Sequence, residues 1–130
     1  MSKKQQQQPG LSWKDEPDKH DFPAAADYLS LLLSDPGPAV DELRRSQTVQ
    51  RKAKDLLRAS RLPLLSPDDP EVSRDLRKVA KGEPLSPVLL VRGQALAGRA
   101  LIVADGYHRI CAAYHLDEDG DIPCRLVDLP

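Results

Sequence analysis

Apolar positions recur at helical spacing in the first half of the chain and form short continuous runs in the second half. Asp21 and Pro23 predict the start of a helix, because Asp is a good capping residue and Pro fits the first turn. The apolar positions of this helix are Ala25, Tyr28, Leu29 and Leu32. The Asp-Pro-Gly-Pro sequence at 35–38 then ends it.

A second helical stretch is predicted over residues 39–61, which contain neither Gly nor Pro. Its apolar stripe consists of Val49, Ala53, Leu56 and Leu57. Val40 and Leu43 are out of phase with that stripe, so we expect a bend or break near Ser46. Pro63 ends the stretch.

The pattern in the second half of the chain predicts elements in the order helix, strand, loop, strand, helix, strand. Asp69 as cap, Pro70 in the first turn and Gly82 after the end mark a helix with the apolar face Val72, Leu76, Val79 and Ala80. The runs 87–91 and 100–104 are typical of strands buried on both faces, and 92–99 is a loop between them. Residues 107–116 return to helical spacing, and 122–127 alternate as a strand. Pro123 indicates that this last strand lies at an edge or begins there.

We therefore expect an α/β protein with a small mixed sheet. Residues 1–20, with Gln at positions 5–8 and few branched apolar residues, are expected to form a disordered tail. Residues 21–61 are expected as a helical extension and 62–130 as the core. The helix between the last two strands leaves them parallel only if it crosses over the sheet.

Composition narrows the classes of function. The chain holds one Trp, three Tyr and one Phe, too few for an aromatic platform that stacks single-stranded nucleic acid. Its apolar runs are far shorter than the roughly 18 residues of a membrane span, and no apolar signal region follows the first lysines. We therefore expect a cytoplasmic protein without a membrane partner, in which Cys111 and Cys124 are reduced and buried.

The segment 105–109 gathers polar groups where a buried strand turns into a helix. The first amides of a helix lack partners and carry partial positive charge, so they attract anions. Gly106 lets a phosphate approach the backbone, Arg109 offers two-point binding and His108 adds a donor. The alternative is purely structural: Asp105 caps the helix and pairs with Arg109 at the surface.

The sequence Ala-Asp-Gly-Tyr-His-Arg-Ile-Cys-Ala-Ala at 104–113, with 85–91 before it and 122–127 after it, resembles the core of the ParB/sulfiredoxin superfamily. The resemblance covers residues 62–130, and the turn is most similar to the Asp-Gly-His-His-Arg of the archaeal free serine kinase. In that superfamily a Gly-x-x-Arg turn at a helix start binds nucleotide phosphates. The resemblance implies a ParB/sulfiredoxin-like fold that binds ATP or CTP with Mg²⁺ through Asp105, Gly106, Tyr107, His108 and Arg109.

Departures from the superfamily pattern restrict the reaction. Tyr107 stands where sulfiredoxin has its catalytic cysteine, which disfavours a reductase. Only the segment 110–130 follows Arg109, so the helix-turn-helix DNA reader of ParB proteins is not expected. A kinase or nucleotide hydrolase needs a catalytic carboxylate, and the acidic residues available for that role are Asp68, Asp69, Glu71 and Asp105.

Asp105, His108 and Glu71 are the catalytic candidates, and Asp105 would contact Mg²⁺ only together with the nucleotide. No metal site made by protein ligands alone is expected. His108 and His115 lie about 10 Å apart on a helix, too far to share one ion. His20 falls in the expected tail.

A competing prediction rests on residues 44–61, where Asp55 is the single acid among seven basic residues. Arg44, Arg51 and Arg58 recur every seven residues, which places them on one face if the segment is a continuous helix. That face would serve a non-enzymatic module that contacts nucleic acid or another protein. A solvated basic face is the plainer interpretation.

Overall fold

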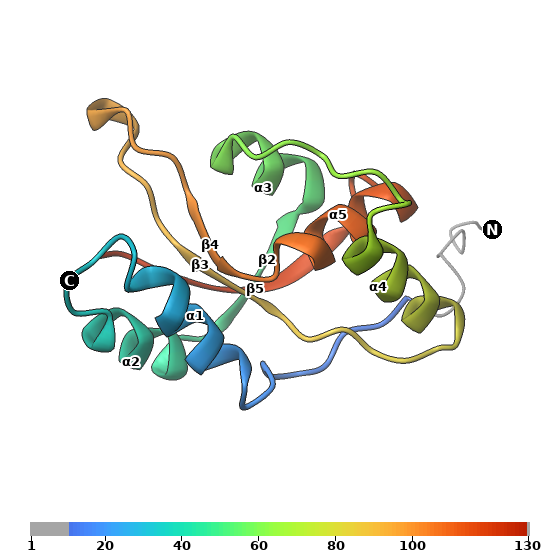
Figure 1. Cartoon of the computed structure of the whole chain (residues 1–130), viewed down its shortest axis with the longest axis horizontal. Helices are drawn as coiled ribbons and strands as arrows, with labels where there is room; N and C mark the ends of the chain where they lie inside the picture. Colours follow the sequence, from blue (N-terminus) through green and yellow to red (C-terminus); the bar gives the residue numbers. More distant parts are fainter. Residues whose placement is uncertain (1–10, 130) are drawn as a thin grey trace.

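The computed structural model describes residues 11–129, which form a four-stranded sheet with helices on both faces (Figure 1). The strands neighbour one another in the order β2 (Thr48–Lys52), β5 (Asp121–Val127), β3 (Val88–Val91) and β4 (Ile102–Asp105). β5 is antiparallel to β2 and parallel to β3, and β3 is antiparallel to β4. The prediction of an α/β protein with a small mixed sheet is confirmed.

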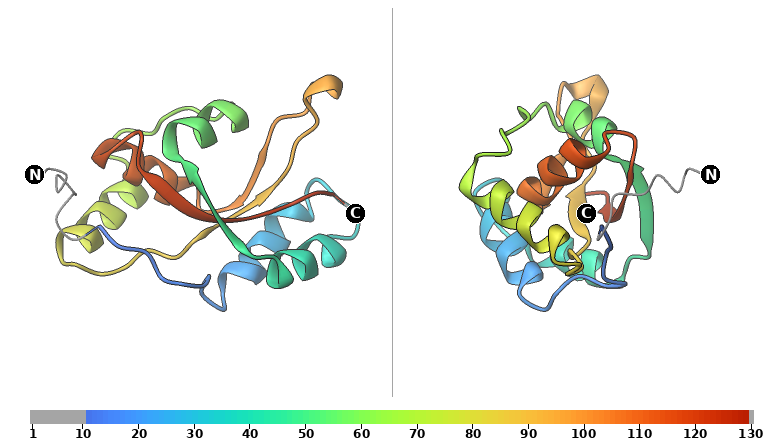
Figure 2. Two further views of the ribbon diagram at one scale, coloured as in Figure 1. Left: turned by 180° about the vertical axis from the view of Figure 1, so that it is seen from behind. Right: turned by 90° about the vertical axis from the view of Figure 1, so that its right-hand side faces the viewer.

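Two helices, α1 (Asp21–Leu29) and α2 (Gly37–Arg45), cover one face of the sheet (Figure 1). The other face carries α3 (Ala53–Ser60), α4 (Pro70–Ala80) and α5 (Tyr107–Leu116). A short 3₁₀ turn, η1 (Ala95–Ala97), lies at the tip of the β3–β4 hairpin, which projects beyond the helical layers (Figure 2).

Strand β3 shows why its sequence is an uninterrupted apolar run. Leu89 and Val91 pack into the cluster formed with α1 and α2, whereas Val88 and Leu90 pack into the cluster on the opposite face. Successive side chains of a strand point to opposite faces, so a strand covered on both sides needs apolar residues at every position. The prediction of a doubly buried strand is confirmed here.

The prediction of one helical stretch over 39–61 is wrong in its middle. α2 ends at Arg45, close to the expected break at Ser46, but residues 48–52 form β2. The buried Arg125 accounts for the change, because its Nη1 donates to the α2 carbonyl oxygens of Leu43 and Arg44 at 3.0 and 3.1 Å, and its Nε donates to Thr48 Oγ1 at 3.1 Å. A cation at a helix C-terminus is stabilising, and this one also fixes the chain as it enters β2.

Strand β5 lies inside the sheet, so the edge position, one of the two alternatives inferred from Pro123, is wrong, and the other, a proline near the beginning of the strand, is closer to the structure. Pro123 faces Gln50 of β2, and pairing with β3 begins only at the next residue, Cys124. The proline therefore precedes the part of β5 that is paired on both sides. β4 and β5 are not neighbours, and they run in opposite directions because β3 is parallel to one and antiparallel to the other.

Residues 21–61, predicted as a helical extension, contribute one strand to the sheet and two helices to one of its faces. β2 pairs with β5, and α1 and α2 pack against the sheet. Of the expected tail 1–20, residues 1–10 lie outside the described residues, and the prediction is wrong for residues 11–20, which contact the fold. Lys14 N–H donates to the Leu85 carbonyl at 2.8 Å, and Leu85 N–H donates to the Ser12 carbonyl at 3.0 Å.

Several local predictions are confirmed. Asp69 caps α4, because its Oδ2 accepts the backbone N–H of Glu71 at 3.0 Å and of Val72 at 3.1 Å.

Cys111 and Cys124 are free and buried, and burial raises the pKa of the Cys124 thiol to about 12. Among residues 11–129, no helix combines the length and apolar composition that a membrane crossing requires.

Candidate functional site

Gly106 forms the turn from β4 into α5, at a place where no side chain fits. Its φ of 111° lies in the left-handed region, and a Cβ atom here would come within 2.5 Å of Val88 Cγ1. No side chain caps the start of α5. The Asp105 carboxylate accepts a hydrogen bond from Arg109 Nη2 at 3.0 Å instead, so the prediction that Asp105 caps this helix is wrong. The predicted pairing with Arg109 is present, but it is largely buried and not at the surface.

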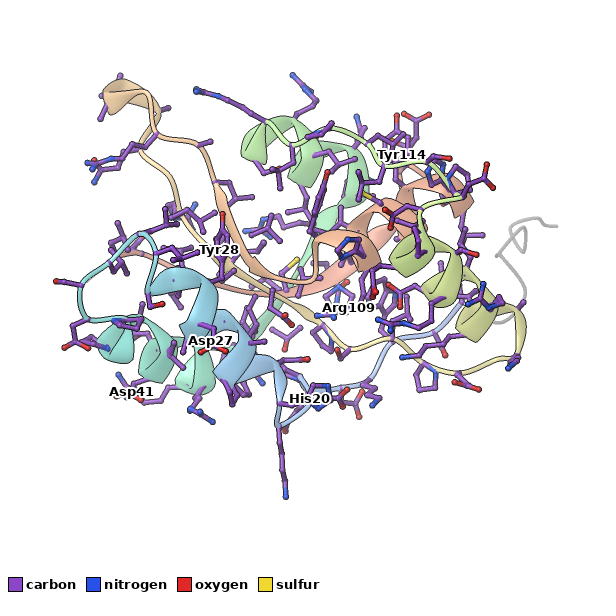
Figure 3. All side chains as sticks on the ribbon, in the orientation of Figure 1. His20, Asp27, Tyr28, Asp41, Arg109 and Tyr114 are labelled. Carbon is purple, nitrogen blue, oxygen red and sulfur yellow. The ribbon has the colours of Figure 1, made fainter. Side chains whose placement is uncertain are left out.

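Arg109 lies at the centre of a largely buried polar cluster. Its Nη2 contacts Asp105 Oδ2 and also lies 3.3 Å from the Pro87 carbonyl oxygen and 3.9 Å from Asp21 Oδ2. Its side chain is 17% exposed, and its Nε is buried with no hydrogen-bond partner in the described part of the chain. Figure 3 shows Arg109 below the start of α5, with His20 beneath it near the start of α1.

Asp21 connects this cluster to the N-terminal segment. Its carboxylate is 5% exposed, and Oδ2 accepts the Ser86 hydroxyl at 2.8 Å and the Asp18 backbone N–H at 3.0 Å. Asp21 is thus the first residue of α1 rather than its cap; His20 occupies the cap position without a side-chain cap bond. The contact joins segments that lie 65 positions apart in the sequence.

The two carboxylates around Arg109 influence each other. The pKa of the Asp105 carboxyl is raised above its usual value, chiefly by burial, although the Arg109 guanidinium lowers it. The nearby Asp21 carboxylate raises the pKa of Asp105 further. One guanidinium is therefore shared by two acids, and the cluster can take up a proton more readily than exposed carboxylates do.

A polar pocket of about 280 Å³ opens beside this cluster and is called the α5 pocket below. Its basic lining residues are Lys14, Arg74, Lys78 and Arg109, and its acidic lining residues are Asp18, Asp21, Glu71, Asp75 and Asp105. His20 and His108 complete the ionisable set. The pocket therefore combines donors for an anion with a surplus of carboxylates that would oppose an anion entering alone.

Asp75 is a site residue that was not predicted from the sequence. It is 6% exposed and, among the described residues, makes no hydrogen bond or ion pair. Burial raises the pKa of its carboxyl, outweighing the lowering by Arg109. Its signal in the sequence is its place between Val72 and Val79 on the buried stripe of α4, where an apolar residue is the rule.

The structure also brings together a group that could hold a cation. One ligand atom each of Asp18, His20 and Asp21 lie within 4.8 Å of one another, although His20 is assigned to a tail by its sequence context. The carboxylates already have basic neighbours, since Lys14 Nζ lies 2.6 Å from Asp18 Oδ1 and Arg109 lies near Asp21. Carboxylate oxygens suit Mg²⁺, but the cluster by itself does not establish an ion.

The other predicted site residues divide into those that line the α5 pocket and those that do not. His108 lines it, with Nε2 4.0 Å from Asp69 Oδ2, and Glu71 lines it while pairing with Arg74. The Tyr107 side chain is engaged elsewhere, because its hydroxyl donates to the Pro63 carbonyl oxygen at 2.6 Å, and Tyr107 is not among the lining residues. Asp68 and Asp69 do not line it either.

The predicted basic face of 44–61 is not a single helical face, because β2 interrupts the helix. Arg44 belongs to α2 and lies 4.6 Å above the Phe22 ring centroid. Arg51 belongs to β2 and Arg58 to α3. The heptad spacing of these three arginines therefore has no geometric meaning here.

Comparison of the chain with protein-family models, with curated proteins and with solved structures finds no match. The chemistry of the α5 pocket therefore rests on its own residues. Its three defining features are a helix start without a side-chain cap, an arginine held between two carboxylates, and the unpaired Asp75.

Proposed function

We propose that the α5 pocket binds the phosphate groups of a nucleotide together with Mg²⁺. The observation that carries this proposal is the start of α5, where a glycine in a left-handed conformation precedes the helix and no side chain caps it. Such a helix start offers N–H donors and partial positive charge to a phosphate. The resemblance of 104–113 to the phosphate-binding turn of the ParB/sulfiredoxin superfamily supports the same ligand, with ATP or CTP as the first nucleotides to test.

The carboxylates of the pocket require the phosphate to enter with a divalent cation. Five acids line it against four Lys and Arg side chains, so a bare triphosphate would meet net repulsion. Mg²⁺ takes oxygen ligands from carboxylates and phosphates together, which turns this repulsion into attraction. In this proposal Asp105 and the neighbouring Asp21, which both lie near Arg109, would share the cation with the nucleotide.

Arg109 has a supporting role in this proposal rather than that of a free clamp. Its Nη2 is engaged by Asp105, Asp21 and the Pro87 carbonyl, so its charge is held in place behind the start of α5. His108 is freer, with 42% of its side chain exposed, and it lines the pocket. A phosphate would therefore meet the α5 amides and His108 first, in the positive field of Arg109.

Phosphoryl transfer is the reaction class that this arrangement would support, with Asp75 as proton acceptor. Asp105 is occupied by Arg109 and Glu71 by Arg74, whereas Asp75 has no hydrogen-bond partner in the described chain. An acceptor hydroxyl or water would give its proton to Asp75 as its oxygen bonds to the terminal phosphorus, and the bond to the nucleoside diphosphate would break.

Calorimetric titration with Mg-ATP, Mg-CTP and Mg-ADP tests the binding step. We expect saturable binding of at least one nucleotide, weakened at least fivefold by His108→Ala and abolished by chelation of Mg²⁺. His115→Ala is the matched control, because His115 is on the same helix, contacts the Leu65 carbonyl and does not line the α5 pocket. Absence of binding by folded protein, or equal losses in both variants, would contradict the proposal.

A further inference from the structure

A second concave surface, distinct from the α5 pocket, lies between α3 and the β3–β4 hairpin. It has a volume of about 430 Å³, within the range of pockets that hold small organic ligands, and shares no lining residue with the α5 pocket. Its apolar lining residues include Leu56, Ala59, Leu90, Leu101 and Leu126. Leu90 and Leu126 are register partners on adjacent strands. Leu56 and Leu90 are buried, so the accessible part of the floor consists of Ala59, Leu101 and Leu126.

Arginines surround this apolar floor, and the surface is called the Arg groove below. They are Arg51, Arg58, Arg61, Arg92 and Arg99, and the only acidic lining residue is Asp55. Five like charges around one small apolar surface repel one another, so the arrangement is unfavourable unless an anion joins it. Guanidinium groups suit that task because they bind carboxylate or phosphate oxygens at two points.

The partners of these arginines within the chain leave much of the charge uncompensated. Arg92 pairs with Asp128 at 2.9 Å, and Arg58 lies 3.8 Å from Asp55. The other three have no carboxylate partner among residues 11–129: Arg51 donates to the Gln50 carbonyl, Arg61 to the Gly98 carbonyl and Arg99 to Gln94.

The backbone of Arg61 is a second unusual feature of the groove. Its φ of 59° is the only positive φ of a non-glycine residue in the described chain. A left-handed conformation is costly for a residue with a Cβ, and glycine is the usual residue at such a helix end. Its guanidinium Nη1 donates to the Gly98 carbonyl oxygen in the hairpin at 3.2 Å.

We propose that the Arg groove binds a small organic anion with an apolar body, of the class of medium-chain carboxylates. The apolar chain would cover the leucine floor, and its carboxylate would accept hydrogen bonds from Arg51, Arg61 or Arg99. The groove contains no aromatic residue on which a nucleic-acid base could stack, which favours an aliphatic anion over a nucleotide or single strand.

Displacement of the fluorescent anion 1-anilinonaphthalene-8-sulfonate from the full chain tests this proposal. Decanoate is expected to displace it, whereas acetate, which lacks the apolar body, and decanol, which lacks the charge, do not at the same concentration. The double variant Arg51→Gln/Arg99→Gln should weaken decanoate binding at least tenfold. Ala59→Glu, which adds a carboxylate at an exposed position of the groove, should weaken it similarly.

Arg45→Gln/Arg77→Gln is the matched control, because it removes the same charge from two exposed residues that line neither surface. Circular dichroism establishes that each variant is folded. The proposal is overturned if folded protein does not bind decanoate, if the control weakens binding as much as the groove variants, or if decanol binds as tightly as decanoate. Capture of a single-stranded oligonucleotide with no binding of decanoate would also overturn it.

Discussion

At the scale of single residues, Gly106 is a position with little tolerance for change. Both its positive φ and the proximity of Val88 exclude a side chain. We expect Gly106→Ala to lower the free energy of unfolding by about 2 kcal/mol or more, because left-handed strain and overpacking act together. Urea-induced unfolding measures the loss.

Gly82→Ala separates these two causes. Gly82 also has a positive φ, of 79°, but nothing lies within 4 Å of a Cβ atom added there. This control should therefore cost only the conformational part, about 1 kcal/mol. Equal losses in the two variants would show that the contact with Val88 does not constrain the turn.

Asp75 gives the site a dependence on pH. Burial raises the pKa of its carboxyl in the folded state, so the folded protein binds this proton more tightly than the unfolded chain does. The free energy of unfolding therefore falls as pH rises from the unfolded pKa through the folded pKa. We expect Asp75→Asn to stabilise the protein at pH 7 by about 1 kcal/mol, the order of the cost of a buried group without a partner.

Urea unfolding between pH 3 and pH 7 measures this effect. The advantage of Asp75→Asn should shrink as pH falls and Asp75 becomes protonated in both states. Asp41→Asn, at an exposed position of α2, is the control and should leave the pH profile unchanged. A variant less stable than the original chain at pH 7 would rule out an unpaired buried charge at Asp75.

How far the sequence predicts the site depends on the separation of its residues along the chain. Gly106 and Arg109 are close neighbours in the sequence, so local spacing is enough to place both residues at the start of a helix. The contact of Asp21 with Ser86 spans 65 positions and cannot be read from any local pattern. Asp75 has a weaker signal, because it is an acidic residue on the apolar stripe of α4. An acidic residue at such a position is usually interpreted as lying at the exposed edge of the helix.

At the scale of elements, α4 depends on its cap. Asp69 accepts two backbone N–H groups at the start of the helix, and Pro70 follows it. We expect Asp69→Ala to lower the free energy of unfolding by about 1 kcal/mol, and Asp69→Asn by less, because Asn retains an acceptor oxygen. Asp68→Ala is the control in urea unfolding, since Asp68 makes no cap bond in α4. Equal effects at the two positions would contradict the cap.

The elements that the sequence predicts well are those with local start and stop signals. Asp69 and Gly82 bracket α4, and Gly106 marks the start of α5. β2 was not predictable in this way, because Val49 fits both a helical stripe and a strand. Its strand conformation is decided by pairing with β5 and by the distant Arg125, which ends α2 and binds Thr48. Tertiary contacts thus override local spacing.

At the scale of the whole molecule, a formal charge of −1 conceals two surfaces of opposite character. The α5 pocket has more acidic than Lys and Arg residues, whereas the Arg groove has five arginines and one aspartate. The fold brings together residues that are distant in the sequence: the residues lining the α5 pocket come from the N-terminal segment, from α4 and from the start of α5. We expect the first surface to need a divalent cation for an anionic ligand and the second to bind anions without one.

A nuclear magnetic resonance titration of backbone amides with Mg-ATP and Mg-CTP tests directly whether a nucleotide binds at the start of α5. We expect saturable shifts of the amides of Gly106, Tyr107 and His108 that disappear when Mg²⁺ is chelated. Amides that remain unshifted at millimolar nucleotide, or shifts confined to residues of the Arg groove, would contradict a nucleotide site at the start of α5.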